Sequence, residues 1–159
     1  MIPAFKVVIA YEDLSTGRQA KEACNFVAEN LSHKWQVTSQ MWKFELLANR
    51  ELREMAAEDA AMADLIIVSC HGERELPAGV GAWIELWAGQ KGGAVALVAV
   101  LDGAPGQAER AEHTQAYLAG VAIRARMEFL AWPQVWLKQE NLRVTRRSRT
   151  ARQALLRAA

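Results

Sequence analysis

Two adjacent carboxylates, Glu12 and Asp13, directly follow the first hydrophobic run of the chain, residues 6–11. That run predicts a buried strand, and the residues from Leu14 onward predict a helix. Open α/β sheets bind their ligands at the carboxyl ends of their strands. The pair could therefore hold a divalent cation such as Mg²⁺, bind a phosphoryl group through that cation, or only cap the helix.

A third carboxylate, Glu85, lies between Trp83 and Trp87 on a short helix expected after the third strand. A carboxylate can attack or stabilise an oxocarbenium-like sugar while a base leaves. The two indoles could stack on that base. Their spacing of four also predicts that both bury one face of the helix while Glu85 points into water.

Cys70 and His71 end the third hydrophobic run. A neighbouring imidazole can activate a thiolate, but adjacent side chains on a strand point to opposite faces. We therefore interpret His71 as a hydrogen-bonding loop residue at the edge of the site. With His33 and His113 it has no metal-ligand spacing, and the chain has no glycine-rich phosphate loop.

Hydrophobic runs that predict strands alternate with segments of helical pattern. The strands are expected at residues 6–11, 35–41, 65–68, 94–101 and 128–131, and the later helices at 44–63, 82–89 and 107–124. Such βα units predict a parallel sheet with right-handed crossovers. The expected fold is a single flavodoxin-like (βα)5 domain, a three-layer sandwich with sheet order 2-1-3-4-5.

The composition of the 159 residues, 52% of them hydrophobic, is typical of one globular domain. Residues 138–159 contain seven Lys or Arg against a single Glu, so a basic helix or tail follows a domain of residues 1–137. This tail could contact nucleic acid, although a solvated terminal helix is the favoured interpretation. Only two cysteines, no secretory signal and no apolar stretch of about 20 residues predict a soluble cytoplasmic protein that does not enter a membrane.

The order of strands and acidic residues resembles the receiver domain of bacterial two-component response regulators. Residues 8–18 look like the receiver's acidic pair and the start of its first helix, and residues 64–69 are similar to the strand that carries the phosphorylated aspartate. Trp132 and Pro133 fall where receivers place a Lys-Pro pair. The resemblance covers about residues 5–137.

Three functional positions of a receiver are changed here. Ser69 stands at the position of the phospho-acceptor, Trp132 replaces the lysine, and Leu101 with Asp102 ends the fourth strand without a hydroxyl. The resemblance therefore implies a degenerate receiver-like signalling or interaction module that is not phosphorylated on aspartate. Its pocket would comprise Glu12, Asp13, Ser69, Leu101, Trp132 and Pro133, with Cys70, His71 and Asp102 at its edge. Without a carboxylate at position 69, a cation such as Mg²⁺ at Glu12 and Asp13 would bind weakly, and no other cofactor is expected.

Receivers also associate through the face of helix 4, strand 5 and helix 5. That resemblance implies a homodimer or a docking surface for another protein at Tyr117, Val121, Trp132, Val135 and Trp136. It further implies a cis bond between Trp132 and Pro133. As an alternative, residues 79–87 look like TIR domains and nucleoside deoxyribosyltransferases, which implies an enzyme that cleaves an N-glycosidic bond with Glu85.

Overall fold

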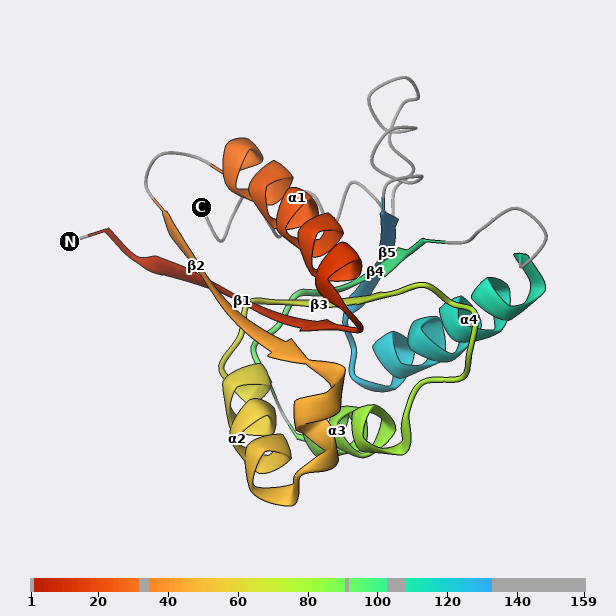
Figure 1. The fold of residues 1–159 in the computed structure, drawn as a ribbon. Coiled ribbons are helices and arrows are strands. Elements are labelled where there is room, and N and C mark those ends of the chain that lie inside the picture. Colours follow the sequence, from red (N-terminus) through yellow and green to blue (C-terminus); the bar gives the residue numbers. More distant parts are fainter. Residues whose placement is uncertain (1, 32–34, 91, 103–107, 133–159) are drawn as a thin grey trace.

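A five-stranded parallel sheet forms the centre of the protein (Figure 1). The computed structural model describes residues 2–31, 35–90, 92–102 and 108–132. In chain order the elements are β1 (Ala4–Tyr11), α1 (Leu14–Asn30), β2 (Gln36–Lys43), the 3₁₀ helix η1 (Phe44–Ala48), α2 (Arg50–Ala61), β3 (Leu65–Cys70), α3 (Ala78–Ala88), β4 (Ala96–Leu101), α4 (Ala108–Arg124) and β5 (Glu128–Trp132). The sheet order β2-β1-β3-β4-β5 confirms the order predicted from the sequence.

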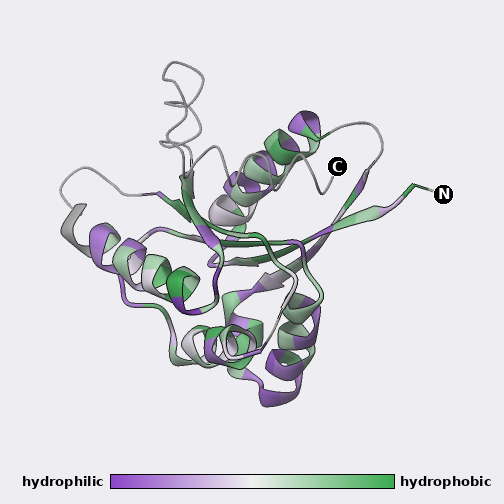
Figure 2. Ribbon diagram, turned by 180° about the vertical axis from the view of Figure 1, so that it is seen from behind, coloured by the Kyte–Doolittle hydropathy of each residue, from purple (hydrophilic) through white to green (hydrophobic). Residues whose placement is uncertain are grey.

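Helices cover both faces of this sheet. Along β1, Val7 and Ile9 pack with α1, whereas Val8 and Ala10 pack with the opposite layer of α2, α3 and α4. Figure 1 shows α1 on one side of the sheet and the other three helices on the other. In Figure 2 the central strands are mostly hydrophobic, and the helices alternate between hydrophobic and hydrophilic residues. The core is therefore divided into two apolar layers, one on each face.

The position of each strand in the sheet follows from its residue pattern. All six residues of β3 are buried, as the unbroken apolar run at its start predicts for a central parallel strand. Strand β2 alternates between exposed and half-buried residues over its first half, which is the pattern of an edge strand. The predicted burial of Cys24 in α1 is confirmed.

Two helices differ from the sequence-based expectation. The helix expected over residues 44–63 is divided at Asn49, because the side chain of Asn49 accepts a hydrogen bond from the backbone N–H of Leu52 and starts α2 there. Helix α3 begins at Ala78 rather than Ala82. Gly79 allows this, since a Cβ at Gly79 would lie 2.6 Å from the carbonyl oxygen of Leu47.

The expected fifth helix and the basic segment 138–159 lie outside the described residues, as does Pro133 with its expected cis bond. None of the helices in the described part of the chain combines the length and apolar character needed to cross a bilayer.

Candidate functional site

The register of the sheet brings three strand ends to one edge. Tyr11 of β1 is paired with Ser69 of β3, and Cys70 of β3 with Leu101 of β4. Beyond these pairs, the N–H of Glu12 donates to the carbonyl oxygen of Ser69 at 3.1 Å, and the N–H of Asp102 donates to the carbonyl oxygen of Cys70 at 3.0 Å. The residues that follow β1, β3 and β4 are therefore held side by side.

This edge includes the boundary between β1 and β3, where the order in which the chain adds strands to the sheet reverses. The chain leaves β1 toward α1 on one face and leaves β3 toward α3 on the other face (Figure 1). Neighbouring strands whose connections separate in this way leave a crevice at their carboxyl ends, where open α/β sheets bind ligands.

Asp13 has two roles at this edge, because its two carboxylate oxygens have different partners. Its Oδ1 accepts a hydrogen bond from the N–H of Thr16 at 2.9 Å, and the Thr16 hydroxyl oxygen accepts one from the N–H of Asp13 at 2.9 Å. This reciprocal capping box starts α1 and confirms the capping that the sequence predicts. The second oxygen, Oδ2, remains for His71.

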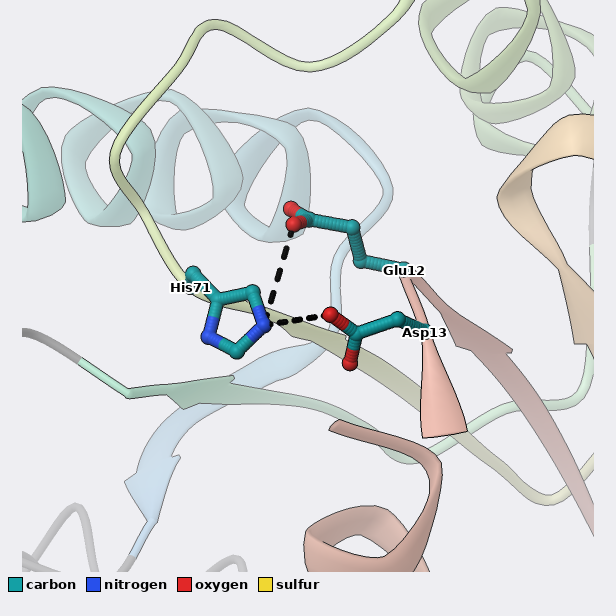
Figure 3. Close-up of side chains that lie close together, drawn as sticks. All are labelled: Glu12, Asp13 and His71. Atoms are coloured by element: carbon teal, nitrogen blue, oxygen red, sulfur yellow. Dashed lines mark hydrogen bonds and ion pairs between the residues drawn. The ribbon is translucent and has the colours of Figure 1, made fainter. Parts of the chain in front are cut away.

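His71 lies between three carboxylates (Figure 3 shows two of them). Its Nε2 is 2.6 Å from Asp13 Oδ2 and 3.9 Å from Glu12 Oε2, and its Nδ1 is 3.4 Å from Asp102 Oδ2. The His71 side chain is 22% exposed, whereas the carboxylate side chains are 39–46% exposed. The cluster is therefore accessible from solvent, with the imidazole as its most buried member.

The backbone conformation after His71 holds the ring in this place. Gly72 has a φ of 76°, a value that side-chain-bearing residues rarely adopt. A Cβ at Gly72 would also lie 3.1 Å from the Cα of Ala111 in α4. The turn that directs His71 toward β1 therefore depends on glycine for both conformation and space.

The ion pair between His71 and Asp13 shifts the pKa of both groups. The hydrogen bond that His71 donates to the Asp13 carboxylate, together with the surrounding negative charge, raises the pKa of His71 above its usual value of 6.5. The backbone hydrogen bond from Thr16, followed by the hydrogen bond to His71, lowers the pKa of Asp13. Both shifts favour an imidazolium–carboxylate pair near neutral pH.

Glu12, Asp13 and His71 can also share a cation. Each offers one ligand atom, and these atoms lie within 4.8 Å of one another. Two carboxylates and an imidazole suit Mn²⁺, Fe²⁺ or Zn²⁺ better than Mg²⁺, which prefers oxygen ligands. Asp102 beside Nδ1 matches the outer carboxylate that commonly orients a metal-bound histidine.

The structure brings together some of the residues that the sequence assigns to one pocket. Glu12, Asp13, His71 and Asp102 form the cluster, and His71 is the member whose ligand potential the sequence analysis missed. Histidine spacing could not reveal it, because its partners Glu12 and Asp13 are nearly sixty residues earlier in the chain. Its position directly after the third strand was the available signal.

The side chains of the other described pocket residues, Ser69, Cys70, Leu101 and Trp132, are not part of this cluster. Ser69 is fully buried, and its hydroxyl donates to the carbonyl oxygen of Thr16 at 2.7 Å. Trp132 is half-buried with its ring centroid 5.0 Å from that of Phe26 in α1, and Leu101 is half-buried at the end of β4. Cys70 packs in the apolar layer of α2, α3 and α4, on the face of the sheet opposite to α1. Burial raises the pKa of its thiol to about 12. Cys70 and His71 thus point to opposite faces, as the strand pattern predicts.

Glu85 forms an ion pair on the outer surface of α3. Arg124 of α4 contacts its two carboxylate oxygens at 2.9 and 3.2 Å, and this interaction lowers the pKa of Glu85. Trp83 and Trp87 are buried in the core, so their rings are not open for stacking on a base.

The expected association face is only partly exposed. Tyr117 of α4 is 37% exposed, but Val121 is buried in the protein's own core and Trp132 is half-buried. Val135 and Trp136 lie outside the described residues. Within the described part, Tyr117 is the expected interface residue that is most open to a partner.

No family model, curated protein or solved structure matches this chain. The fold and the cluster therefore define its class by themselves: an α/β protein with a five-stranded parallel sheet and a carboxylate–histidine cluster at the carboxyl ends of β1, β3 and β4.

Proposed function

We propose that this chain is a flavodoxin-like signalling or protein-interaction module of receiver-like type that works without aspartyl phosphorylation and binds a divalent cation at Glu12, Asp13 and His71. One observation carries the proposal: these residues place three ligand atoms within 4.8 Å of one another, just beyond the carboxyl ends of β1 and β3.

The receiver-like part rests on the sheet order and on the acidic pair after β1. Ser69, at the position of a receiver's phospho-acceptor, is buried and its hydroxyl is engaged by Thr16. Phosphoryl transfer to that position would require opening the contact between β3 and α1. Signalling would instead pass through a second protein or a second copy of this chain, and the exposed Tyr117 surface of α4 is a candidate contact.

A cation would replace the proton that His71 holds. The imidazole must be neutral to ligate through Nε2, so binding releases a proton and strengthens as the pH rises. Nδ1 would keep its proton beside the Asp102 carboxylate, whose Oδ2 is 3.4 Å away, and the negative charge there would help to orient the ring. The site would therefore respond to both pH and cation concentration.

Calorimetric titration of the full chain with Mn²⁺ and Zn²⁺ at pH 6 and pH 8 tests the cation part. We expect binding of one ion, tighter at pH 8, and a loss of affinity of about tenfold or more in His71→Gln. The matched control is His113→Gln, which removes an exposed histidine of α4 and should leave binding unchanged. Equal affinity of His71→Gln and the wild type would contradict the proposal.

Incubation with acetyl phosphate and Mg²⁺, followed by intact-mass measurement, tests the signalling part. The proposal expects no stoichiometric phosphoryl adduct, and such an adduct would refute it. The alternative, N-glycosidic cleavage by Glu85, remains a prediction; it requires base release from NAD or a deoxynucleoside that disappears in Glu85→Gln. The ion pair of Glu85 with Arg124 and the burial of both indoles do not favour it.

A further inference from the structure

The face of α2 that points away from the core carries two exposed methionines. Met55 is 54% exposed, and Met62, the C-cap residue of the helix, is 67% exposed. The buried residues of α2, which are Ala56, Ala57 and Ala60, pack against the sheet layer on the other side of the helix. Residues seven positions apart lie on the same side of a helix, so the two methionines share one solvent-facing strip.

Two exposed carboxylates complete this strip. Glu51 lies four positions before Met55 and Glu58 three positions after it, so both share its side of the helix. Among the described residues neither carboxylate has an ion-pair or hydrogen-bond partner, whereas the nearby Glu54 pairs with Arg50. The α2 strip, residues 51, 55, 58 and 62, is therefore apolar and negatively charged at once.

One segment of the chain itself complements the α2 strip in charge and in pattern. Residues 138–159 contain seven Lys or Arg against a single Glu. Within this segment Val144, Ala151 and Leu155 recur at spacings of seven and four, which predicts a narrow apolar stripe on a helix with arginines on both flanks. The two methionines of α2 have the same spacing of seven. A basic amphipathic segment is thus the kind of partner that an acidic, methionine-bearing surface fits.

The length of the chain allows this contact within one molecule. The described part ends at Trp132 of β5, and the sheet order places β5 at the edge opposite to β2. The two edge strands are separated by about 19 Å, since neighbouring strands lie about 4.8 Å apart. Residues 133–143 span about 35 Å when extended, at about 3.3 Å per residue. The connection is therefore long enough to bring the basic segment to α2 without a second copy of the chain.

We propose that residues 138–159 pack on the α2 strip of the same molecule. The apolar stripe of the segment covers Met55 and Met62 and removes their exposed surface from water. Its arginines pair with Glu51 and Glu58, so the contact weakens as salt screens these charges. This interaction surface goes beyond the proposed function and includes no residue of the carboxylate–histidine cluster.

A nitroxide spin label on the full chain tests this contact through the methionine methyl signals. Cys24 and Cys70 are buried, so a cysteine introduced by Thr150→Cys can be labelled selectively. We expect the label to broaden the methyl signals of Met55 and Met62 strongly at low salt. The broadening should decrease in about 1 M NaCl, where the screening length is about 3 Å. It should persist when the labelled protein is diluted with unlabelled protein, and its loss on dilution would overturn the intramolecular contact.

Charge-reversed variants of the labelled protein complete the experiment. Glu51→Lys combined with Glu58→Lys should abolish the broadening. The matched control, Glu22→Lys combined with Glu29→Lys, reverses two exposed carboxylates of α1 on the other side of the sheet and should keep it (Figure 1). All four side chains are exposed, so neither variant removes a core contact. Absence of broadening in the parent protein, undiminished broadening in the α2 variant or an equal loss in the control would each overturn the proposal. His71→Gln should broaden as the parent does, which separates this result from the cation site.

Discussion

The hydroxyl of Ser69 donates a 2.7 Å hydrogen bond to the backbone carbonyl oxygen of Thr16, in the buried contact between β3 and α1. A carboxylate at position 69 would face that oxygen without a donor. We predict that Ser69→Asp, which restores a receiver's acceptor residue, loses about 3 kcal/mol of unfolding free energy or more in urea denaturation. Ser69→Ala should lose only about 1 kcal/mol. A stable Ser69→Asp variant that accepts phosphate would show that position 69 is an accessible acceptor site.

Substitution can distinguish the two roles of the Asp13 carboxylate, the cap of α1 through Oδ1 and the ion pair with His71 through Oδ2. Asp13→Asn keeps an acceptor for the Thr16 N–H, whereas Asp13→Ala removes the helix cap and should lose about 1 kcal/mol of unfolding free energy. Both variants should lower the pKa of His71, because both remove the negative charge beside Nε2. Urea denaturation measures the first effect and NMR titration of the imidazole the second. A His71 pKa unchanged in both variants would contradict the assigned ion pair.

The stability of the protein should depend on pH through the same pair. The folded-state pKa of His71 is raised, so its contribution is fully present below about pH 6.5 and is lost as the pH rises through the raised value. The folded-state pKa of Asp13 is lowered, so its contribution is present above about pH 3.8 and is lost as the pH falls through the lowered value. The pair therefore stabilises most between about pH 4 and pH 6.5.

Thermal denaturation of the wild type and His71→Gln across pH 5 to 9 checks this dependence. The difference in Tm between them should be largest near pH 6 and should shrink as the pH rises. A difference that stays constant over this range would mean that the charge of His71 does not contribute to stability.

Two glycines of α3 should respond oppositely to the same substitution. Gly79→Ala would place a Cβ 2.6 Å from the carbonyl oxygen of Leu47, and backbone atoms cannot yield easily, so we expect a loss of about 1–3 kcal/mol of unfolding free energy. Gly81→Ala meets no neighbouring atom and should gain about 0.5–1 kcal/mol from helix propensity. Urea denaturation of the two variants, whose substituted residues lie two positions apart in the same helix, provides the comparison. Similar losses in both would argue against the close packing of α3 on η1.

The sequence predicts the sheet well because its signals are local. The branched apolar run at 65–68 and the alternating pattern at 35–41 are enough to assign a central and an edge strand. The site is harder to predict, since the contact of His71 with Asp13 depends on the register that pairs Tyr11 with Ser69. Hydrophobic periodicity does not determine that register. The division of the second helix at Asn49 was also missed, because it depends on one side-chain cap.

The most direct test of the proposed cation site is nitrogen NMR of the His71 imidazole at pH 7.5, recorded with and without one equivalent of Zn²⁺. Our account predicts that Nε2 shifts to a metal-bound value while Nδ1 stays protonated beside Asp102. The same spectrum of Glu12→Gln should show a weaker response, since that variant removes one of the ligand charges. A His71 ring whose nitrogens do not respond to Zn²⁺, while Zn²⁺ binds elsewhere or not at all, would contradict the account.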